Sequence, residues 1–146
     1  MSTLLLSATS IVHLIATCSM FGIVLFVHAV QYPMLAKVPE AGREGFEEEY
    51  TRRAGIVIMP LMLIEAVTVV ILLALSPGSA SLCGAFLLAG IWGITFLVSV
   101  PCHRSLSRAW TDRVHRLLIW SNFARCLCWG ARVVVAVRLL DLVTPA

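Results

Sequence analysis

The sequence predicts an all-α fold, a four-helix transmembrane bundle, from its composition, its apolar runs and the placement of its charges. Hydrophobic residues make up 60% of the chain and charged residues 13%, with a mean hydropathy of +0.94. This balance lies far outside that of soluble domains. Four apolar runs are each close to the ~20 residues that cross ~30 Å of hydrocarbon. The 146 residues therefore form a single integral membrane domain.

The four predicted spans follow one another with short connections. They cover approximately residues 4–32, 56–75, 82–100 and 117–140. Between the first two, the stretch from Glu47 to Arg53 places acidic residues three or four positions before basic ones. That spacing is typical of a short amphipathic helix, which either lies at the membrane surface or extends the second span.

The basic residues predict the orientation of the bundle. Two connections hold four each: Lys37, Arg43, Arg52 and Arg53 after the first span, and Arg104, Arg108, Arg113 and Arg116 after the third. The N-terminal residues and the turn between spans two and three hold none. By the positive-inside rule, both basic connections lie in the cytoplasm and both termini lie on the non-cytoplasmic side.

The fourth span carries permanent charges in an apolar setting. One helical face presents its polar and aromatic residues together: Asn122, Arg125, Trp129 and Arg132. Arg138 lies near the helix end, where its side chain reaches the interface. Glu65 is the one acid inside an apolar run. Because an unpaired charge in hydrocarbon is costly, we expect Glu65 to pair with Arg125, with Arg132 further out.

Polar residues on all four spans predict a buried cluster near the cytoplasmic side. Its members are His28, Gln31, Tyr32, Glu65, His103, Asn122, Arg125, Trp129 and Arg132. His28, His103 and Glu65 are candidate ligands for a transition metal, which two imidazoles and a carboxylate commonly bind. Hydrogen bonds that merely hold the helices together are the other interpretation. The sequence leaves open whether the cluster binds metal, haem, quinone or pigment.

Several motifs resemble a family of small four-span bacterial membrane proteins without an assigned function. They are "VQYPML", "PLMLIE", "VPCHRSL" and "SNFARCLCWGAR". The family pattern is Pro-Met-Leu-x-Glu, Pro-x-His-x-x-Leu and Asn-Trp-x-Arg. It extends over nearly the whole chain, matches Glu65, His103, Asn122, Arg125 and Trp129, and implies the bacterial inner (cytoplasmic) membrane. More remotely, the chain is similar to the anthrone-oxygenase-like membrane family, which implies oxidation of an aromatic substrate but has Asn in place of His103.

Two hypotheses about function follow. The favoured one is a non-catalytic subunit or scaffold of a larger membrane complex, which contacts lipid and other membrane subunits or copies of itself. Its support is the small size, the lack of a soluble domain, and Tyr50, where the four-span family tends to have His. The chain also departs from that family at Phe123, where the family tends to have Trp. The alternative is a small membrane oxidoreductase, or a protein that binds a hydrophobic ligand or metal in the cytoplasmic half. Whether the protein is an enzyme stays open, and nucleic acid is not an expected partner.

Overall fold

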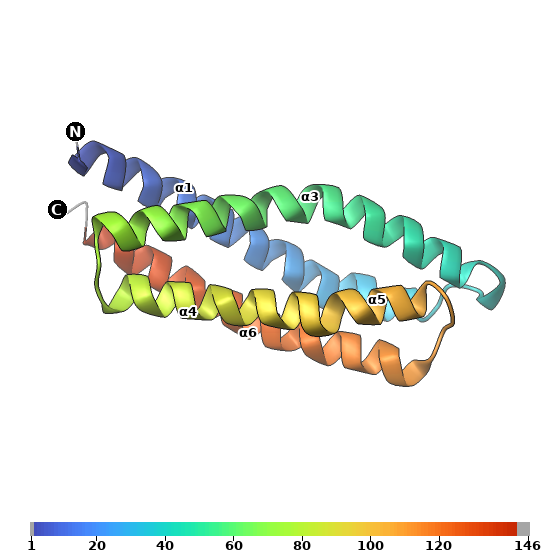
Figure 1. Ribbon diagram of the computed structural model, residues 1–146. Helices are drawn as coiled ribbons and strands as arrows, with labels where there is room; N and C mark the ends of the chain where they lie inside the picture. Colours follow the sequence, from blue (N-terminus) through green and yellow to red (C-terminus); the bar gives the residue numbers. More distant parts are fainter. Residues whose placement is uncertain (1, 143–146) are drawn as a thin grey trace.

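The computed structural model describes residues 2–142, and all regular structure in this part of the chain is helical (Figure 1). The elements form four long rods. They are α1 (Ser2–Phe26) with the π-helical turn η1 (Val27–Gln31) and α2 (Tyr32–Leu35); α3 (Glu40–Leu75); α4 (Ser79–Ile94) with the π-helical turn η2 (Thr95–Ser99) and α5 (Val100–Leu106); and α6 (Asp112–Asp141).

The rods form an antiparallel bundle with two distinct ends. Figure 1 shows the start of α1 and the end of α6 at one end, together with the turn from α3 to α4. The α2–α3 and α5–α6 connections lie at the opposite end. We call this the basic end, defined by residues 36–39 and 107–111, because the basic connections of the sequence meet there.

Three of the rods are long and apolar enough to cross a membrane, judged by length and composition. They are Thr3–Leu35, Glu40–Leu75 and Ser79–Leu106. Large apolar side chains point outward from them, for example Phe86 and Leu97, as expected of an integral membrane protein. The fourth rod, α6, is also long, with 30 residues, but its arginines lower its hydropathy.

The expected short amphipathic helix is not a separate element. Its residues form the first turns of α3, which continues without a break to Leu75. Glu49 accepts hydrogen bonds from Arg52 and Arg53 on the exposed side of these turns. Of the two arrangements that the sequence allowed, the structure has the one in which this segment extends the second span.

The two π-helical turns each precede a proline. η1 ends two residues before Pro33, and η2 ends two residues before Pro101. Proline has no N–H to donate and its ring collides with the carbonyl four residues earlier, and a wider turn relieves both problems. A π turn also adds one residue, so side chains beyond it point in different directions from those of a regular helix.

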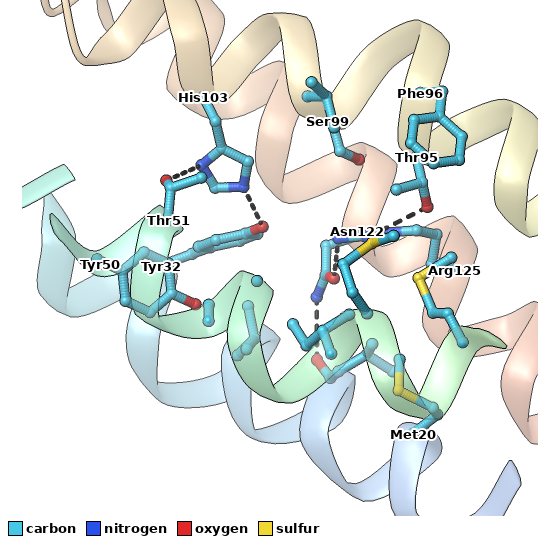
Figure 2. A pocket seen from close by; sticks show the side chains of 18 residues that line it. Met20, Tyr32, Tyr50, Thr51, Thr95, Phe96, Ser99, His103, Asn122 and Arg125 are labelled. Carbon is cyan, nitrogen blue, oxygen red and sulfur yellow. Dashed lines mark hydrogen bonds between the residues drawn. The ribbon is translucent and has the colours of Figure 1, made fainter. Parts of the chain in front are cut away.

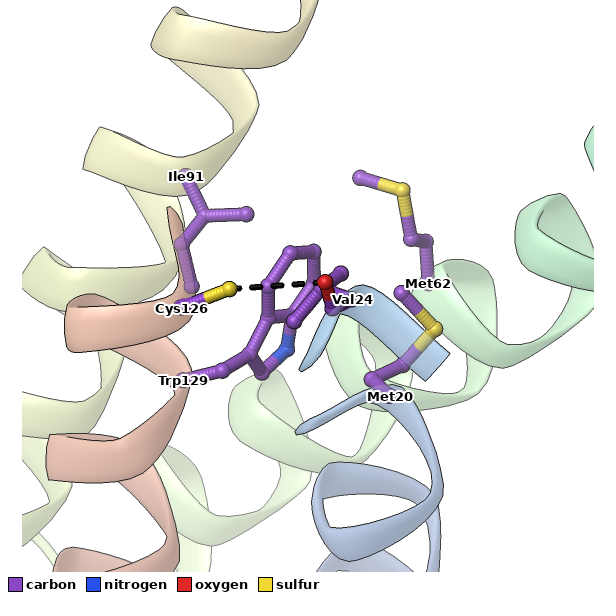
Figure 3. Close-up of a cluster of buried hydrophobic side chains, with 6 residues drawn as sticks. All are labelled: Met20, Val24, Met62, Ile91, Cys126 and Trp129. Atoms are coloured by element: carbon purple, nitrogen blue, oxygen red, sulfur yellow. Dashed lines mark hydrogen bonds between the residues drawn. The ribbon is translucent and has the colours of Figure 1, made fainter. Parts of the chain in front are cut away.

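An apolar core fills the middle of the bundle (Figure 3). Its buried side chains are Met20, Val24, Met62, Ile91, Cys126 and Trp129. Trp129 is fully buried at the centre of this group. The core lies between two polar regions. They differ in the ion pairs and hydrogen bonds that their buried charged side chains form.

Candidate functional site

The first polar region, the Glu65 cluster, consists of Glu65, Thr17, Trp129 and Arg132. Thr17 Oγ1 donates to Glu65 Oε1 at 2.8 Å, and Trp129 Nε1 donates to Oε2 at 2.9 Å. Arg132 Nη2 forms an ion pair with Oε1 at 3.0 Å, and its Nη1 donates to the Gly84 carbonyl. All four residues are at most 1% exposed. Both carboxylate oxygens are therefore satisfied inside the protein.

The predicted partner of Glu65 was wrong, because the ion pair is made by Arg132 and not by Arg125. The apolar run that marks the second span begins at residue 56, but α3 begins at Glu40. Glu65 thus lies 25 residues into α3 (65 minus 40), whereas Arg125 and Arg132 lie 13 and 20 residues into α6, counted from Asp112. The longer helix places Glu65 deeper, at the level of Arg132.

The second polar region surrounds a cavity of about 130 Å³ on the side of the core nearer the basic end (Figure 2). All four rods contribute to its walls. Its polar lining residues are Tyr32, Tyr50, Thr51, Thr95, Ser99, His103, Asn122 and Arg125. The remaining lining is apolar, including Met20, Met59 and Met62. An apolar cavity with a few convergent polar groups is the usual form of a small-molecule site.

Arg125 reaches this cavity without an acidic partner. Its Nη2 donates to Asn122 Oδ1 at 2.7 Å, and its Nη1 lies 3.4 Å from Thr95 Oγ1. Asn122 is held in turn by its Nδ2 donating to the Val24 carbonyl at 3.0 Å. Arg125 is 8% exposed, its Nε has no partner, and no described carboxylate forms an ion pair with it. A buried cation therefore faces the cavity with only neutral neighbours.

His103 links the cavity to a buried acid. Its Nδ1 is paired with Glu47 Oε1 and lies 3.3 Å from Thr51 Oγ1. Its Nε2 lies 3.2 Å from the hydroxyl of Tyr32, which points toward the cavity in Figure 2. Glu47 is fully buried, and its second oxygen has no partner. These three residues form a continuous chain from α3 through α5 to the cavity wall.

Sequence reasoning missed Glu47 because it stands in a run of three glutamates that looks solvated. A periodic signal does exist. The lining or buried residues of α3 recur every three or four positions: Glu47, Thr51, Ala54, Ile58, Met62, Glu65, Val69 and Leu72. Continuing this stripe backward from the apolar run places Glu47 on the inward face.

Two predicted members of the cluster belong to neither polar region. The ring of His28 packs against Phe123, with centroids 5.6 Å apart, and Gln31 borders a shallow pocket on the outer surface of α3. A regular helix would continue the inward face of α1 from Val24 through His28 and Gln31, but η1 intervenes. The buried stripe consequently passes through Val27 and Tyr32.

The metal candidates are not brought together. Glu65 is enclosed by its own donors, His28 contacts Phe123, and His103 is paired with Glu47. Within residues 2–142 no three histidine, cysteine, aspartate or glutamate side chains are grouped so that they could hold a metal ion. The predicted set of His28, His103 and Glu65 is therefore not a site in this structure.

The cavity opens sideways between α3 and η2. Ala54, Gly55 and Met59 form one edge of this mouth, and Phe96 and Val100 form the other. Met59 and Phe96 are 39% and 45% exposed. A Cβ atom on Gly55 would meet no atom within 4 Å, so nothing fills the mouth there. The opening lies along the apolar flank of the bundle.

Comparisons of the chain with protein-family models, with curated proteins and with solved structures find no match. The resemblance to the four-span bacterial family stays a prediction, and the function is argued from the geometry of the site.

Proposed function

We propose that this protein binds a membrane-soluble amphiphile, with the polar head of the ligand on Arg125 and its chain leaving through the mouth between α3 and η2. The single observation that carries the proposal is the buried guanidinium of Arg125, which lines a cavity and lacks an acidic partner. This is the ligand-binding alternative of the sequence analysis. It requires no metal and assigns no reaction.

The energetics of Arg125 support a ligand with an oxygen-bearing head. A charged arginine at the centre of a membrane helix costs about 2.5–3.5 kcal/mol or more. Arg132 offsets this cost with Glu65, whereas the partners of Arg125 are an amide and hydroxyl groups, all of them neutral. The Nε atom of each arginine lacks a partner, so that atom does not distinguish them. What distinguishes Arg125 is the missing acid and the adjacent cavity.

The size and the opening of the cavity support an amphiphile and not a large cofactor. A cavity of about 150 Å³ suffices for one benzene ring, and this one measures about 130 Å³. It holds a small head and a few methylene groups. The rest of the ligand must lie outside, and the mouth leads along apolar side chains of α3 and η2 where an acyl chain is compatible.

We further propose that α6 is a fourth span, with both termini on the non-cytoplasmic side of the bacterial inner membrane. With 30 residues, α6 is about 45 Å long. Arg125 and Arg132 point inward, and Arg138 is exposed near the end of the helix. A reporter fused after Ala146 should be active outside the cytoplasm, and cytoplasmic labelling of that end would reject this orientation.

The binding proposal is tested with the full-length protein in a mild maltoside detergent. We expect decanoate or 1-decanol to raise the melting temperature, because a ligand at 100 times its Kd stabilises the folded state by about 2.7 kcal/mol. Arg125→Gln should lose most of this stabilisation for the decanoate ion. Arg138→Gln is the matched control on the same helix, since that side chain is exposed.

The other outcomes are equally informative. Equal stabilisation of the wild type, Arg125→Gln and Arg138→Gln would mean that the amphiphile binds elsewhere. No stabilisation by either probe, together with other membrane proteins copurifying in stoichiometric amounts, would favour the subunit or scaffold hypothesis. Mass spectrometry of molecules extracted from the purified protein identifies any native ligand.

A further inference from the structure

The contact between Glu47 and His103 fixes where one proton must be. Glu47 Oε1 and His103 Nδ1 are paired, and two acceptors in such a contact require a hydrogen between them. The proton is therefore shared by these two atoms in every state of the pair. The hydrogen bond on the other side of the imidazole then depends on whether the pair carries a second proton.

The second proton determines the direction of the Tyr32 hydroxyl. Without it, His103 Nε2 has a lone pair and accepts the O–H of Tyr32. With it, Nε2–H donates to the Tyr32 oxygen, so the hydroxyl hydrogen is free to donate into the cavity. Protonating the Glu47–His103 pair thus changes Tyr32 from a group that only accepts from the cavity to one that donates into it.

We propose that the cavity binds the carboxylate of a single-chain amphiphile, and that the Glu47–His103 pair takes up one proton in the same step. This inference rests on the proposed function and names the head group. The proton comes from water or from the ligand's own carboxyl. The carboxylate then accepts hydrogen bonds from Arg125 and from the Tyr32 hydroxyl. The Tyr32 oxygen in turn accepts a hydrogen bond from Nε2–H of His103.

Charge balance supports a coupled step. In the empty cavity, a pair that holds one proton carries one negative charge and Arg125 carries one positive charge, although no described carboxylate contacts Arg125. After binding, the carboxylate cancels Arg125 and the protonated pair is neutral. Binding the anion without a proton would leave one net negative charge in a medium of low dielectric constant, which is strongly unfavourable. Glu65 and Arg132 cancel separately in both states.

The groups around His103 are consistent with this role. They are Glu47, Tyr50 and Thr51 on α3, Tyr32 on α2, Arg125 on α6, and Cys102 and Arg104 beside it on α5. His115 on α6 contacts the Tyr32 carbonyl through Nε2 at 2.9 Å and not the hydroxyl. Arg104 is exposed. Glu47 is the only acid among the described residues that contacts His103.

Calorimetry on the full-length protein in maltoside tests the coupling, with decanoate as the probe and 1-decanol as the neutral control. Titrations at pH 6.5, 7.5 and 8.5, in two buffers of different ionisation heat, count the protons. Decanoate is ionised in water throughout this range. We expect uptake of about one proton per decanoate, so the affinity rises up to about tenfold for each unit by which the pH falls. Binding of 1-decanol should not be accompanied by proton uptake.

Two variants move the affinity in opposite directions. Glu47→Gln removes the negative charge permanently and its amide still satisfies His103, so decanoate should bind at pH 8.5 at least as tightly as it binds the wild type at pH 6.5. His103→Gln keeps the Glu47 charge and removes the proton site, so binding should be weak at every pH. Glu48→Gln, on the exposed side of α3, should behave as the wild type.

The possible results separate the two proposals. Decanoate binding without proton uptake, or with uptake unchanged in both variants, overturns the coupling and leaves the binding function standing. Binding of 1-decanol without binding of decanoate would likewise overturn the coupling and leave the binding function standing. Absence of binding by both probes overturns the binding function and the coupling with it. A merely structural role for Glu47 predicts weaker binding in Glu47→Gln, which is the opposite of our expectation.

Discussion

The Glu65 cluster and the lining of the cavity have similar residue types that are similarly buried. They differ in which groups form hydrogen bonds and ion pairs with their charged side chains. In the cluster, Glu65 receives three donors and Arg132 has its acid. Around the cavity, Arg125 has only neutral partners, and Glu47 keeps one oxygen without a partner. Open volume adjoins the second group and not the first.

Under our proposal, this difference separates polar groups that hold the helices together from polar groups that bind a ligand. A buried charge whose partners are all protein groups fixes the packing of helices. A buried charge that is left incomplete beside a cavity costs stability unless a ligand completes it. Each prediction below tests whether the two regions respond differently to substitution, beginning with the largest effect.

Breaking the ion pair of the Glu65 cluster should have the largest effect. Glu65→Gln or Arg132→Gln should each lower the free energy of unfolding by about 3–5 kcal/mol, since either leaves a buried charge without its partner. SDS-induced unfolding in mixed micelles measures this. The double variant should recover part of the loss. A loss equal to the sum of the single losses would contradict direct coupling of the two side chains.

The indole hydrogen bond to Glu65 should rank second. Trp129→Phe keeps an aromatic ring in the core but removes the donor to a carboxylate, at an expected cost of about 1.5–3 kcal/mol. Trp92→Phe is the matched control, because the Nε1 of Trp92 is buried without a partner. Similar losses in the two variants would show that ring volume, and not the hydrogen bond, accounts for the effect.

Much of the fold follows from the sequence because hydrophobic length and helical period are local signals. The buried residues Thr95, Ser99 and Cys102 of the third rod recur every three or four positions, a period that is visible in the sequence. The first rod keeps a regular helical period as far as Val24 and departs from it at η1, because a π turn adds a residue that no regular period anticipates. Tyr32 is among the predicted cluster residues that do line the cavity.

The pairing of charges was harder to predict than their burial. The inward positions of Glu65, Arg125 and Arg132 follow from the period of each helix. Their partners depend on where each helix begins, and α3 starts 16 residues before the apolar run that marks it in the sequence (56 minus 40). The first turns of α3 are rich in charged residues, so hydropathy does not indicate where the helix begins. For the same reason it indicates neither the depth of Glu65 nor the burial of Glu47.

Neutralising Arg125 should affect stability far less than neutralising Arg132. Arg125→Gln removes a buried cation that has no acid, so the free energy of unfolding should change by about 1 kcal/mol or less in the absence of ligand. The same micelle assay compares the two arginines directly. A loss as large as that of Arg132→Gln would show that Arg125 is structural and would remove the basis for a ligand at this position.

Closing the mouth of the cavity should have the smallest effect on stability. Gly55→Leu adds a side chain where a Cβ meets no atom within 4 Å, so the free energy of unfolding should change by about 0.5 kcal/mol or less beyond the gain in helix propensity. Gly45→Leu gains the same propensity on the exposed side of α3, where a Cβ is also unobstructed, and serves as the control.

Only Gly55→Leu should slow the association of decanoate, as followed by stopped-flow quenching of tryptophan fluorescence. Equal association rates in both variants would mean that the ligand reaches Arg125 by a route other than the gap between α3 and η2.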